Sequence, residues 1–450
     1  MRFLITKNIF PAFIITAFMI TGLTGEATAA GIADLDRFPQ NGGAYLPADP
    51  DRAVTDPAEQ SVYADEYKTR FFAPWRNADL SYLDISLDKI IEFQKNTAKK
   101  KFFVEGGRVL TKDSMTKIAA NVPEAVEMGE PRPGVCLAEA DVRVLPTSTP
   151  LFSSPESALG ARGLLKTDWI QNSTVKPGEP LSVIAASKDG KWLLAATGTV
   201  VGWIKSGKAA LVNDEFMERF MYASYSVFVK DNVAIKGKDG AVIAIAKMGT
   251  LLPVEGRDLL VPVKGKDGWA RIMPYRPADG ETEPFPVPFT PRNAVRAMDQ
   301  LIGEPYGWGG ERGLRDCSSM TRDYFTLFGV WLPRNSGDQA NAGPGIILKG
   351  AESGGKLDTI VRDAVPFATL IHMPGHIMLY IGIYDGEPVV MHNVWGVRIN
   401  APGGKTGRKV IGKTVVSSLR AGAEIENRPK SGLYIDRAEK IVFPIGSTGR

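Results

Sequence analysis

The chain has 450 residues, more than one hydrophobic core usually supports, so the sequence predicts two to four domains. Hydrophobic residues make up 44% and charged residues 23% of the chain, which is typical of a globular protein and argues against a disordered or fibrous one. The net charge is only +4, and the longest basic run is the three lysines at 99–101. This spread of charge argues against a nucleic-acid-binding protein.

The N-terminus has the pattern of a secretory signal peptide at residues 1–29. Arg2 and Lys7 precede an apolar run at 9–23, and the small residues Ala27-Thr28-Ala29 follow it. The run is short for a membrane span. We therefore expect an exported protein, periplasmic or associated with the cell wall, with no membrane span after signal removal. An uncleaved anchor is the alternative.

Residues 30–139 are expected to form an extended arm and a small helical domain. The stretch 31–57 is rich in Pro, Gly and Asp, as extended segments often are. From 63 to 122 the apolar residues recur at helical spacing, and Ser86 can cap one of the helices. Pro131-Arg132-Pro133-Gly134 has the composition of a linker.

Two stretches of short strands follow, at 140–214 and 215–284. In each stretch an apolar run leads into Lys-Asp-Gly, at 188–190 and at 266–268, and a tryptophan comes shortly after. Asp-Gly between apolar runs is a hairpin signal. The repeated pattern predicts two related small β-barrels that pack on each other, because each is near the lower size limit for an independent core.

The last domain is predicted at 285–450. Its proline-rich start is a stiff linker, and Thr290-Pro291 is a typical helix start. Asp316 precedes Cys317 and a run of apolar residues at helical spacing, so Asp316 can cap a helix whose first turn holds the cysteine. The free amides at a helix start favour an anion, which predicts a lowered thiol pKa and donors for an oxyanion.

The chain has three histidines, His372, His376 and His392, all in this last domain. A cysteine at a helix start and a histidine on a nearby strand form the arrangement that activates a thiol as a nucleophile. His376 would take the proton, and either His392 or Asn393 would orient its ring. A two-residue turn at Asp385-Gly386 would place His376 and His392 on opposite faces of a hairpin, so only a bulge or strong twist would join them.

Two other interpretations of these residues stay open. Cys136 and Cys317 could form a disulfide, as cysteines of exported proteins often do. The three histidines together with Cys317 could instead bind zinc. However, Pro374-Gly375 breaks the helix that the spacing of the first two histidines would require. We therefore expect no metal ligand set and no cofactor.

Over about 285–450 the sequence resembles the NlpC-type family of papain-like cell-wall cysteine peptidases. The motifs that carry the resemblance are, in chain order, Pro305-Tyr306-Gly307-Trp308-Gly309-Gly310, Asp316-Cys317-Ser318-Ser319, Pro333-Arg334-Asn335-Ser336-Gly337-Asp338-Gln339, Gly375-His376-Ile377-Met378-Leu379-Tyr380-Ile381-Gly382 and Met391-His392. The upstream segments resemble the family's stabilising N-terminal domain and two bacterial SH3-like domains. The resemblance implies an α+β multidomain fold: a small helical domain, two SH3-like β-barrels and a papain-like, NlpC-type catalytic domain.

The resemblance also implies a function, that of an endopeptidase that cuts peptidoglycan stem peptides between γ-D-glutamate and the diamino acid. Cys317 matches the nucleophile, His376 the base and His392 the orienting residue. Substrate-binding or oxyanion positions are matched by five residues: Tyr306, Trp308, Asp316, Ser318 and Ser336. Members with this domain order accept stems with a free N-terminal L-alanine, and Asp316 matches the acid that binds the amine.

The sequence departs from the family pattern near the expected site, where the spacing from His376 to His392 is longer than usual. Asp-Cys-Ser is followed by Ser319 where the family has glycine. Members also wall the cleft with a tyrosine from the first barrel, but 140–214 contains no tyrosine, and Phe152 or Trp169 could substitute for it. We expect a monomer whose partner is peptidoglycan or its fragments. The alternatives are a related amidase or acyltransferase and a catalytically inert wall-binding scaffold.

Overall fold

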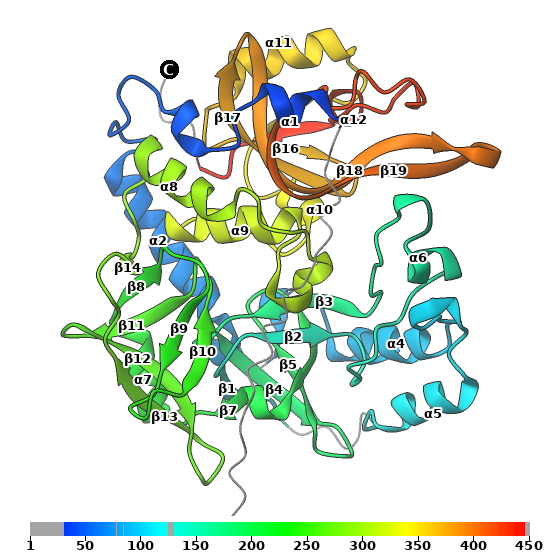
Figure 1. Cartoon of the computed structure of the whole chain (residues 1–450). Helices are drawn as coiled ribbons and strands as arrows, with labels where there is room; N and C mark the ends of the chain where they lie inside the picture. The colour runs from blue at the N-terminus through cyan, green and yellow to red at the C-terminus, as the bar shows by residue number, and fades with distance from the viewer. Residues whose placement is uncertain (1–30, 78, 84, 125–129, 446–450) are drawn as a thin grey trace, which may run out of the picture.

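The computed structural model describes residues 31–445 except 78, 84 and 125–129. The predicted signal peptide at 1–29 lies outside the described residues. Four parts follow one another along the chain (Figure 1): helices, two sheet domains and a last α+β domain stacked above the sheets. The predicted architecture is therefore confirmed. Among the described residues, no helix has both the length and the apolar character needed to cross a membrane.

The N-terminal segment begins with an arm that lies along the last domain. Its helical elements are α1 (Ala33–Arg37), η1 (Gly42–Tyr45), α2 (Pro57–Phe71), α3 (Ala73–Arg76), η2 (Ser81–Leu83), α4 (Leu87–Ala98), η3 (Glu105–Gly107) and α5 (Lys112–Ala120). Ser86 caps α4 as predicted, since its side chain accepts from the backbone N–H of Lys89. The arm is anchored by contacts such as the Asp34 carboxylate accepting from the backbone N–H of Ser418 at 2.7 Å.

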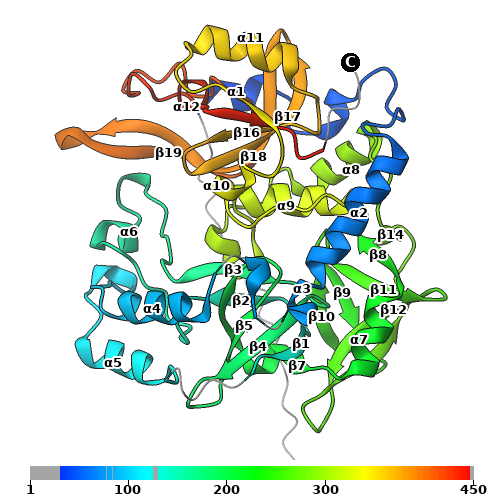
Figure 2. The ribbon, with the colours of Figure 1, turned by 180° about the vertical axis from the view of Figure 1, so that it is seen from behind.

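Helix α2 connects the last domain with the sheet domains, as the view from behind shows (Figure 2). Its buried Gln60 donates to the carbonyls of Val287 and Phe328 and accepts from the backbone N–H of Phe289. One side chain thus satisfies two backbone groups of the segment that leads into the last domain and one within that domain. The helical part therefore packs against the last domain and is held to it by hydrogen bonds.

The first sheet domain has seven strands in the order β3-β2-β6-β5-β4-β1-β7. Its elements are β1 (Arg132–Cys136), β2 (Ala140–Arg143), α6 (Pro155–Leu159), η5 (Ala161–Gly163), β3 (Gln171–Val175), β4 (Pro180–Ala186), β5 (Trp192–Ala196), β6 (Val201–Lys205), η6 (Ser206–Lys208) and β7 (Ala209–Leu211). The expected linker at 131–134 is wrong, because it forms most of β1. The carbonyl of Pro133 accepts from Val212, and Val135 and Cys136 are fully buried, so burial of the strand's apolar end outweighs the turn-like composition.

The second sheet domain pairs a two-stranded sheet, β10-β9, with a five-stranded one, β13-β12-β11-β8-β14. Its elements are α7 (Asp214–Met221), β8 (Ser224–Phe228), β9 (Val233–Lys236), β10 (Val242–Ala246), β11 (Leu251–Glu255), β12 (Asp258–Lys264), β13 (Ala270–Tyr275) and β14 (Thr282–Pro284). The two predicted Lys-Asp-Gly hairpins join β4 to β5 and β12 to β13. Gly190 and Gly268 both have positive φ, as such turns require.

The last domain packs helices on a six-stranded sheet of order β15-β20-β16-β17-β18-β19. Its elements are α8 (Pro291–Leu301), η7 (Trp308–Gly313), α9 (Cys317–Leu327), α10 (Ser336–Gln339), β15 (Gly345–Ile347), α11 (Ser353–Asp363), β16 (Leu370–Met373), β17 (His376–Tyr384), β18 (Glu387–Ala401), η8 (Pro402–Gly404), β19 (Lys405–Ser418), α12 (Tyr434–Arg437) and β20 (Lys440–Val442). Thr290 caps α8 and Pro291 opens it, as predicted. Helix α9 contacts β17 and β18, which brings the cysteine helix to the histidine strands.

A buried cluster of charges joins both sheet domains to the last domain. Arg315, next to the cysteine helix, pairs with Asp231 of the second sheet domain at 2.7 Å and with Asp323 of α9 at 2.7 Å. Asp323 also pairs with Lys176 of the first sheet domain. Burial opposes the charge of Asp323, but Lys176 and Arg315 hold its pKa below the usual value. The three domains therefore share one set of buried ion pairs.

The Asp323→Asn variant is expected to lose about 3–5 kcal/mol of free energy of unfolding, because Arg315 and Lys176 would stay buried with one carboxylate fewer. Urea denaturation followed by circular dichroism measures the loss. Asp267→Asn is the matched control, since the Asp267–Arg271 pair is exposed within a single sheet domain and such pairs contribute little. Equal losses in both variants would contradict the role assigned to the cluster.

Candidate active site

Cys317 is the first residue of α9 and is only 6% exposed. Asp316 caps the helix as predicted: its carboxylate accepts from the backbone N–H of Ser319 at 2.8 Å, and the Ser319 hydroxyl accepts from the backbone N–H of Asp316 at 2.9 Å. This reciprocal pair is a capping box. The helix start, and with it the position of the sulfur, follows from hydrogen bonds among four consecutive residues.

The carboxylate of Asp316 is fully occupied by neighbouring donors. Arg334, which the sequence analysis did not single out, pairs with it at 2.7 Å in a buried site. The other donors are the hydroxyls of Ser318 and Ser319 and the backbone N–H groups of Gly309 and Ser319. Burial opposes the charge, but Arg334 and these donors keep the pKa of Asp316 below its usual value. Asp316 is therefore an anion in a net-neutral pair.

The thiol of Cys317 differs from the prediction. Burial, and next the charge of Asp316, raise its pKa to about 12, although the backbone N–H groups of Ile377 and Ser318 and the charge of Arg334 act in the opposite direction. The expectation of a lowered pKa is wrong because desolvation outweighs the helix amides at a site this buried. The contribution of Ile377 also places the sulfur beside the backbone that follows His376. The thiol is neutral in the free protein.

His376 and His392 are hydrogen-bonded, with 2.8 Å between Nε2 of His376 and Nδ1 of His392. The turn at 385–386 has two residues, and the register shifts between Tyr380 and Gly382, where Gly382 has a φ of 122°. This bulge adds one residue to β17, so both histidines share one face of the sheet. Asn393 points elsewhere and donates to the carbonyl of Arg315 at 2.9 Å. Of the two candidates, the contact with His376 is made by His392.

The hydrogen-bond chain beyond His392 determines where the protons sit. The hydroxyl of Ser417 lies 2.9 Å from the carbonyl of Ser418, which can only accept, and 3.1 Å from Nε2 of His392. Ser417 therefore donates to the carbonyl and accepts from His392, so Nδ1 of neutral His392 carries a lone pair. Nε2 of His376 must then be the donor. Its Nδ1 is left unprotonated, as a base for the thiol requires.

Both histidines are held neutral by burial. Burial, aided by the charge of Arg437, lowers the pKa of His376 to about 3, and burial followed by the charge of His376 lowers that of His392 well below its usual value. The unperturbed histidine pKa is about 6.5. The pair can thus accept a proton at neutral pH, and its charged form depends on a negative group forming nearby.

These pKa values predict acid sensitivity of the fold. Below about pH 6.5 these histidines are protonated in the unfolded chain but stay neutral in the folded one. The free energy of unfolding therefore decreases as the pH is lowered, by up to about 1.4 kcal/mol per pH unit for each histidine. Urea unfolding at pH 7.0 and pH 5.0 measures the slope. In the His392→Asn variant this slope is expected to be smaller by the contribution of one histidine. An unchanged slope would contradict the buried neutral pair.

The other predicted site residues are Tyr306, Ser318, Ser336 and Trp308, and each has its own contacts or exposure. Tyr306 is held by backbone pairing with Arg315, and its pKa is raised well above the usual value by burial and then by the charges of Cys317 and Asp316. Ser318 bonds to Asp316 and Arg334. Ser336 begins α10, which contacts α9 and β17. Trp308 is 39% exposed at the start of η7.

The first sheet domain reaches the site through residues that the sequence analysis did not find. Ser173 accepts from Nε of Arg334 at 2.9 Å, and the carbonyl of Gly163 accepts from the indole of Trp395 at 2.7 Å. The suggested substitutes for the missing tyrosine, Phe152 and Trp169, face the helical part instead. Phe152 pairs with Phe103, and the ring of Trp169 packs on Phe93 and Phe102. Only the fold identifies these contacts, because neither serine nor glycine has a sequence signal of this kind.

The two alternatives for the cysteines and histidines can be compared with the structure. Cys136 and Cys317 are both free, and the Cys136 thiol donates to the carbonyl of Ala138. The disulfide alternative is therefore wrong. Within the described part of the chain, no three His, Cys, Asp or Glu side chains are grouped so that they could hold a metal ion.

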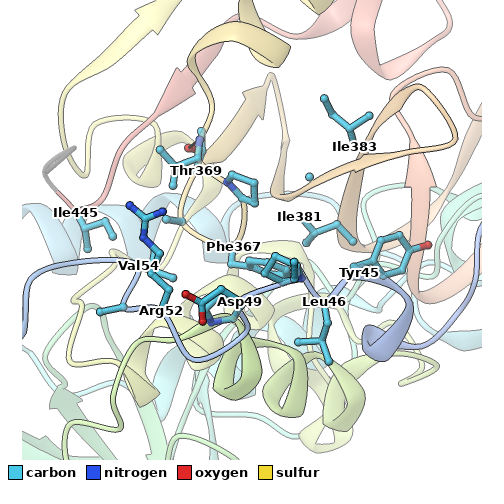
Figure 3. A pocket seen from close by; sticks show the side chains of 18 of the residues that line it. Tyr45, Leu46, Asp49, Arg52, Val54, Phe367, Thr369, Ile381, Ile383 and Ile445 are labelled. Atoms are coloured by element: carbon cyan, nitrogen blue, oxygen red, sulfur yellow. Dashed lines mark hydrogen bonds between the residues drawn. The ribbon is translucent and has the colours of Figure 1, made fainter. Parts of the chain in front are cut away.

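A cavity of about 1000 Å³ lies elsewhere, between the N-terminal arm and the last domain (Figure 3). Its walls include Tyr45 and Arg52 from the arm, Phe367, and Ile381 and Ile383 near the far end of β17. None of the predicted site residues lines it. The thiol and imidazole groups, rather than this cavity, mark the candidate active site.

Four segments of the chain match known protein families. Residues 13–124 match the NLPC_P60 stabilising domain, 150–205 the SH3 domain of SH3b1 type, 213–258 the SH3 domain of SH3b2 type, and 303–411 the NlpC/P60 family. These matches follow the order of the four structural parts.

Known proteins are similar to the chain in sequence or in fold. A segment of 94 residues is 37% identical to a γ-D-glutamyl-L-lysine dipeptidyl-peptidase of Bacillus subtilis (strain 168); it covers 21% of this chain and 30% of that relative's length. A solved structure described as a novel NlpC/P60 endopeptidase, from Photobacterium damselae subsp. piscicida, covers 91% of this chain and 97% of its own, with a TM-score of 0.80 and 21% identity. This second likeness is one of fold.

Proposed function

The chain belongs to the NlpC/P60 family, and we propose that it is a cysteine endopeptidase that hydrolyses peptidoglycan stem peptides at the bond between γ-D-glutamate and the diamino acid. The observation that carries the proposal is the hydrogen-bonded His376–His392 pair beside the helix that begins at Cys317. The choice of bond is supported by the relative that is named a γ-D-glutamyl-L-lysine dipeptidyl-peptidase. The predicted signal sequence supports action outside the cytoplasm.

The proposed reaction begins from a neutral thiol and a neutral imidazole. The sulfur of Cys317 attacks the γ-carbonyl carbon of the D-glutamyl residue while its proton passes to Nδ1 of His376. The hydroxyl of Tyr306 and the N–H groups at the start of α9 are the donors available to the oxyanion. His376 then gives the proton to the departing amine, and the C–N bond breaks to leave a thioester.

The second half of the reaction restores the enzyme. Water loses a proton to Nδ1 of His376 and attacks the thioester carbonyl, and the released sulfur takes the proton back. The imidazolium in both halves donates from Nε2 to His392, whose own proton is accepted by Ser417. Because the thiol is neutral and buried, we expect the thiolate to form only together with the imidazolium, when substrate covers the site.

Mass analysis of digested stem peptides tests the proposal. L-Ala-γ-D-Glu-diaminopimelate is expected to give L-Ala-D-Glu and free diaminopimelate, with no product from Cys317→Ala. Transfer of the acyl group to an amine, or cleavage of another amide, would instead indicate the related acyltransferase or amidase. No turnover of tripeptide or intact sacculus would indicate an inert scaffold.

The free N-terminal amine implied by the resemblance stays a separate prediction. The proposed acid, Asp316, already meets Arg334 and four other donor groups, so an ammonium would have to compete with them. N-acetylation of the tripeptide's L-alanine tests the role: a large loss of kcat/KM supports it, and an unchanged value contradicts it.

A further inference from the structure

Three arginines of the last domain act on one another's charges, and one of them lies next to the turn that precedes His376. Arg398 of β18 and Arg408 of β19 are direct cross-strand partners, an arrangement in which like charges destabilise a sheet. Arg437 ends α12 and donates to the carbonyl of Pro374 at 3.1 Å, in the turn just before His376. Among the described residues, none of the three guanidinium groups forms an ion pair with a carboxylate.

The charges of these arginines affect one another and the base. Burial, and then the charges of Arg398 and Arg408, lower the pKa of Arg437 to about 10. Burial and Arg398 likewise lower the pKa of Arg408, and Arg437 contributes to the lowered pKa of His376. The three positive charges therefore act on one another, and that of Arg437 also acts on the imidazole of His376. Three positive charges that repel one another are stabilised when an anion binds between them.

Unpaired hydrogen-bonding groups lie at the same place. Within the described residues, Nε of Arg398, Nη1 of Arg408 and the hydroxyl of Tyr434 are buried and have no partner. Tyr434 is 3% exposed, and its ring lies 5.1 Å from that of His392 and 6.1 Å from that of His376. Buried donors without acceptors are costly. An acceptor bound here would satisfy several donors at once.

We propose that Arg398, Arg408 and Arg437, together with Tyr434, bind the carboxylates of the amino acid on the leaving-group side of the scissile bond, and so favour a diamino acid with two carboxylates over lysine. This inference rests on the proposed function. His376 delivers a proton to the leaving amine, so the residue that carries that amine lies on the imidazole side, where Arg437 and Tyr434 are. Guanidinium groups bind carboxylates in paired, charge-assisted hydrogen bonds, whereas the side-chain ammonium of lysine would be repelled.

Paired substrates test the inference. L-Ala-γ-D-Glu-meso-diaminopimelate and L-Ala-γ-D-Glu-L-Lys differ in the second carboxylate, and the wild-type protein is expected to favour the first by at least about tenfold in kcat/KM. In Arg398→Gln, Arg408→Gln and Arg437→Gln this ratio is expected to fall toward one. Lys405→Gln is the matched control, because it removes one positive charge from an exposed position on the same hairpin; its ratio should equal that of the wild type. Amidation of the C-terminal carboxylate shows which of the two is bound.

A binding measurement tests the inference even if the arginine variants do not fold. Calorimetric titration of Cys317→Ala with each tripeptide is expected to give at least tenfold tighter binding of the diaminopimelate peptide, with the difference reduced in high salt. Equal kcat/KM values and equal affinities for the two tripeptides would overturn the inference, as would folded arginine variants with an unchanged ratio. Failure of the wild type to cleave either peptide would instead contradict the proposed function, while the titration would still test the binding site.

Discussion

Replacing Cys317 with alanine is expected to lower kcat/KM for the stem tripeptide by at least about 10⁴-fold, because no other group in the site can form the thioester. The side chain is small and sits in the first turn of α9, where the capping box is made by Asp316 and Ser319 and not by the sulfur. The fold should therefore be retained. Steady-state kinetics with mass detection of released diaminopimelate measures the loss.

The chain offers a matched control in its second cysteine. Cys136 is as buried as Cys317 but lies in β1 and bonds to the carbonyl of Ala138. Cys136→Ala should keep the rate of the wild type. Similar losses in both variants would show that cysteine removal acts through the fold, and a fully active Cys317→Ala would refute the proposed nucleophile.

The Ser417→Ala variant is expected to lower kcat by about 100-fold with little change in KM. Ser417 is fully buried in β19, and its hydroxyl accepts the Nε2 proton of His392. Without that acceptor His392 can shift its proton to Nδ1, and His376 would then hold its proton on the nitrogen that must receive one. A base in the wrong tautomer is a known cause of large losses in kcat with the geometry kept.

The tautomer of His376 can be measured directly, and it would not change if Ser417 had only a structural role. Nitrogen NMR of the histidines is expected to show His376 protonated at Nε2 in the wild type and at Nδ1 in part of the Ser417→Ala population. Ser417→Thr keeps a hydroxyl and should retain most of the activity. Ser418→Ala is the neighbouring control, because Ser418 takes part in this series of hydrogen bonds only through its backbone carbonyl. An unchanged kcat in Ser417→Ala would contradict the positioning role.

The positive cluster and the neutral histidine pair belong to one electrostatic arrangement. Burial, and next the charge of Arg437, lower the pKa of His376 in the free protein, which keeps the base unprotonated. If carboxylates of the leaving residue neutralise the arginines, the imidazolium becomes less costly at the moment when the thiol gives up its proton. Substrate binding would thus favour the ion pair that attacks the bond.

Several features of the site could be predicted from the sequence because short-range hydrogen bonds produce them. The start of α9 at Cys317 depends on Asp316 and Ser319, three residues apart. The turn at 385–386 depends on two residues that adopt positive φ, Asp385 at 49° and Gly386 at 74°. The family motifs added the order of the domains and the identity of the thiol and imidazole.

The sequence by itself thus determined individual helix starts and turns and the candidate site residues, and only the tertiary structure decided their states and partners. A helix start predicts an acidic thiol, yet burial by distant strands raises the pKa of Cys317. The bulge before Gly382 brings His392 onto the face of His376. Capping and turns involve neighbours a few residues apart, whereas desolvation, sheet register and the meeting of Arg398 with Arg437 depend on segments far apart in the chain, whose packing no local pattern encodes.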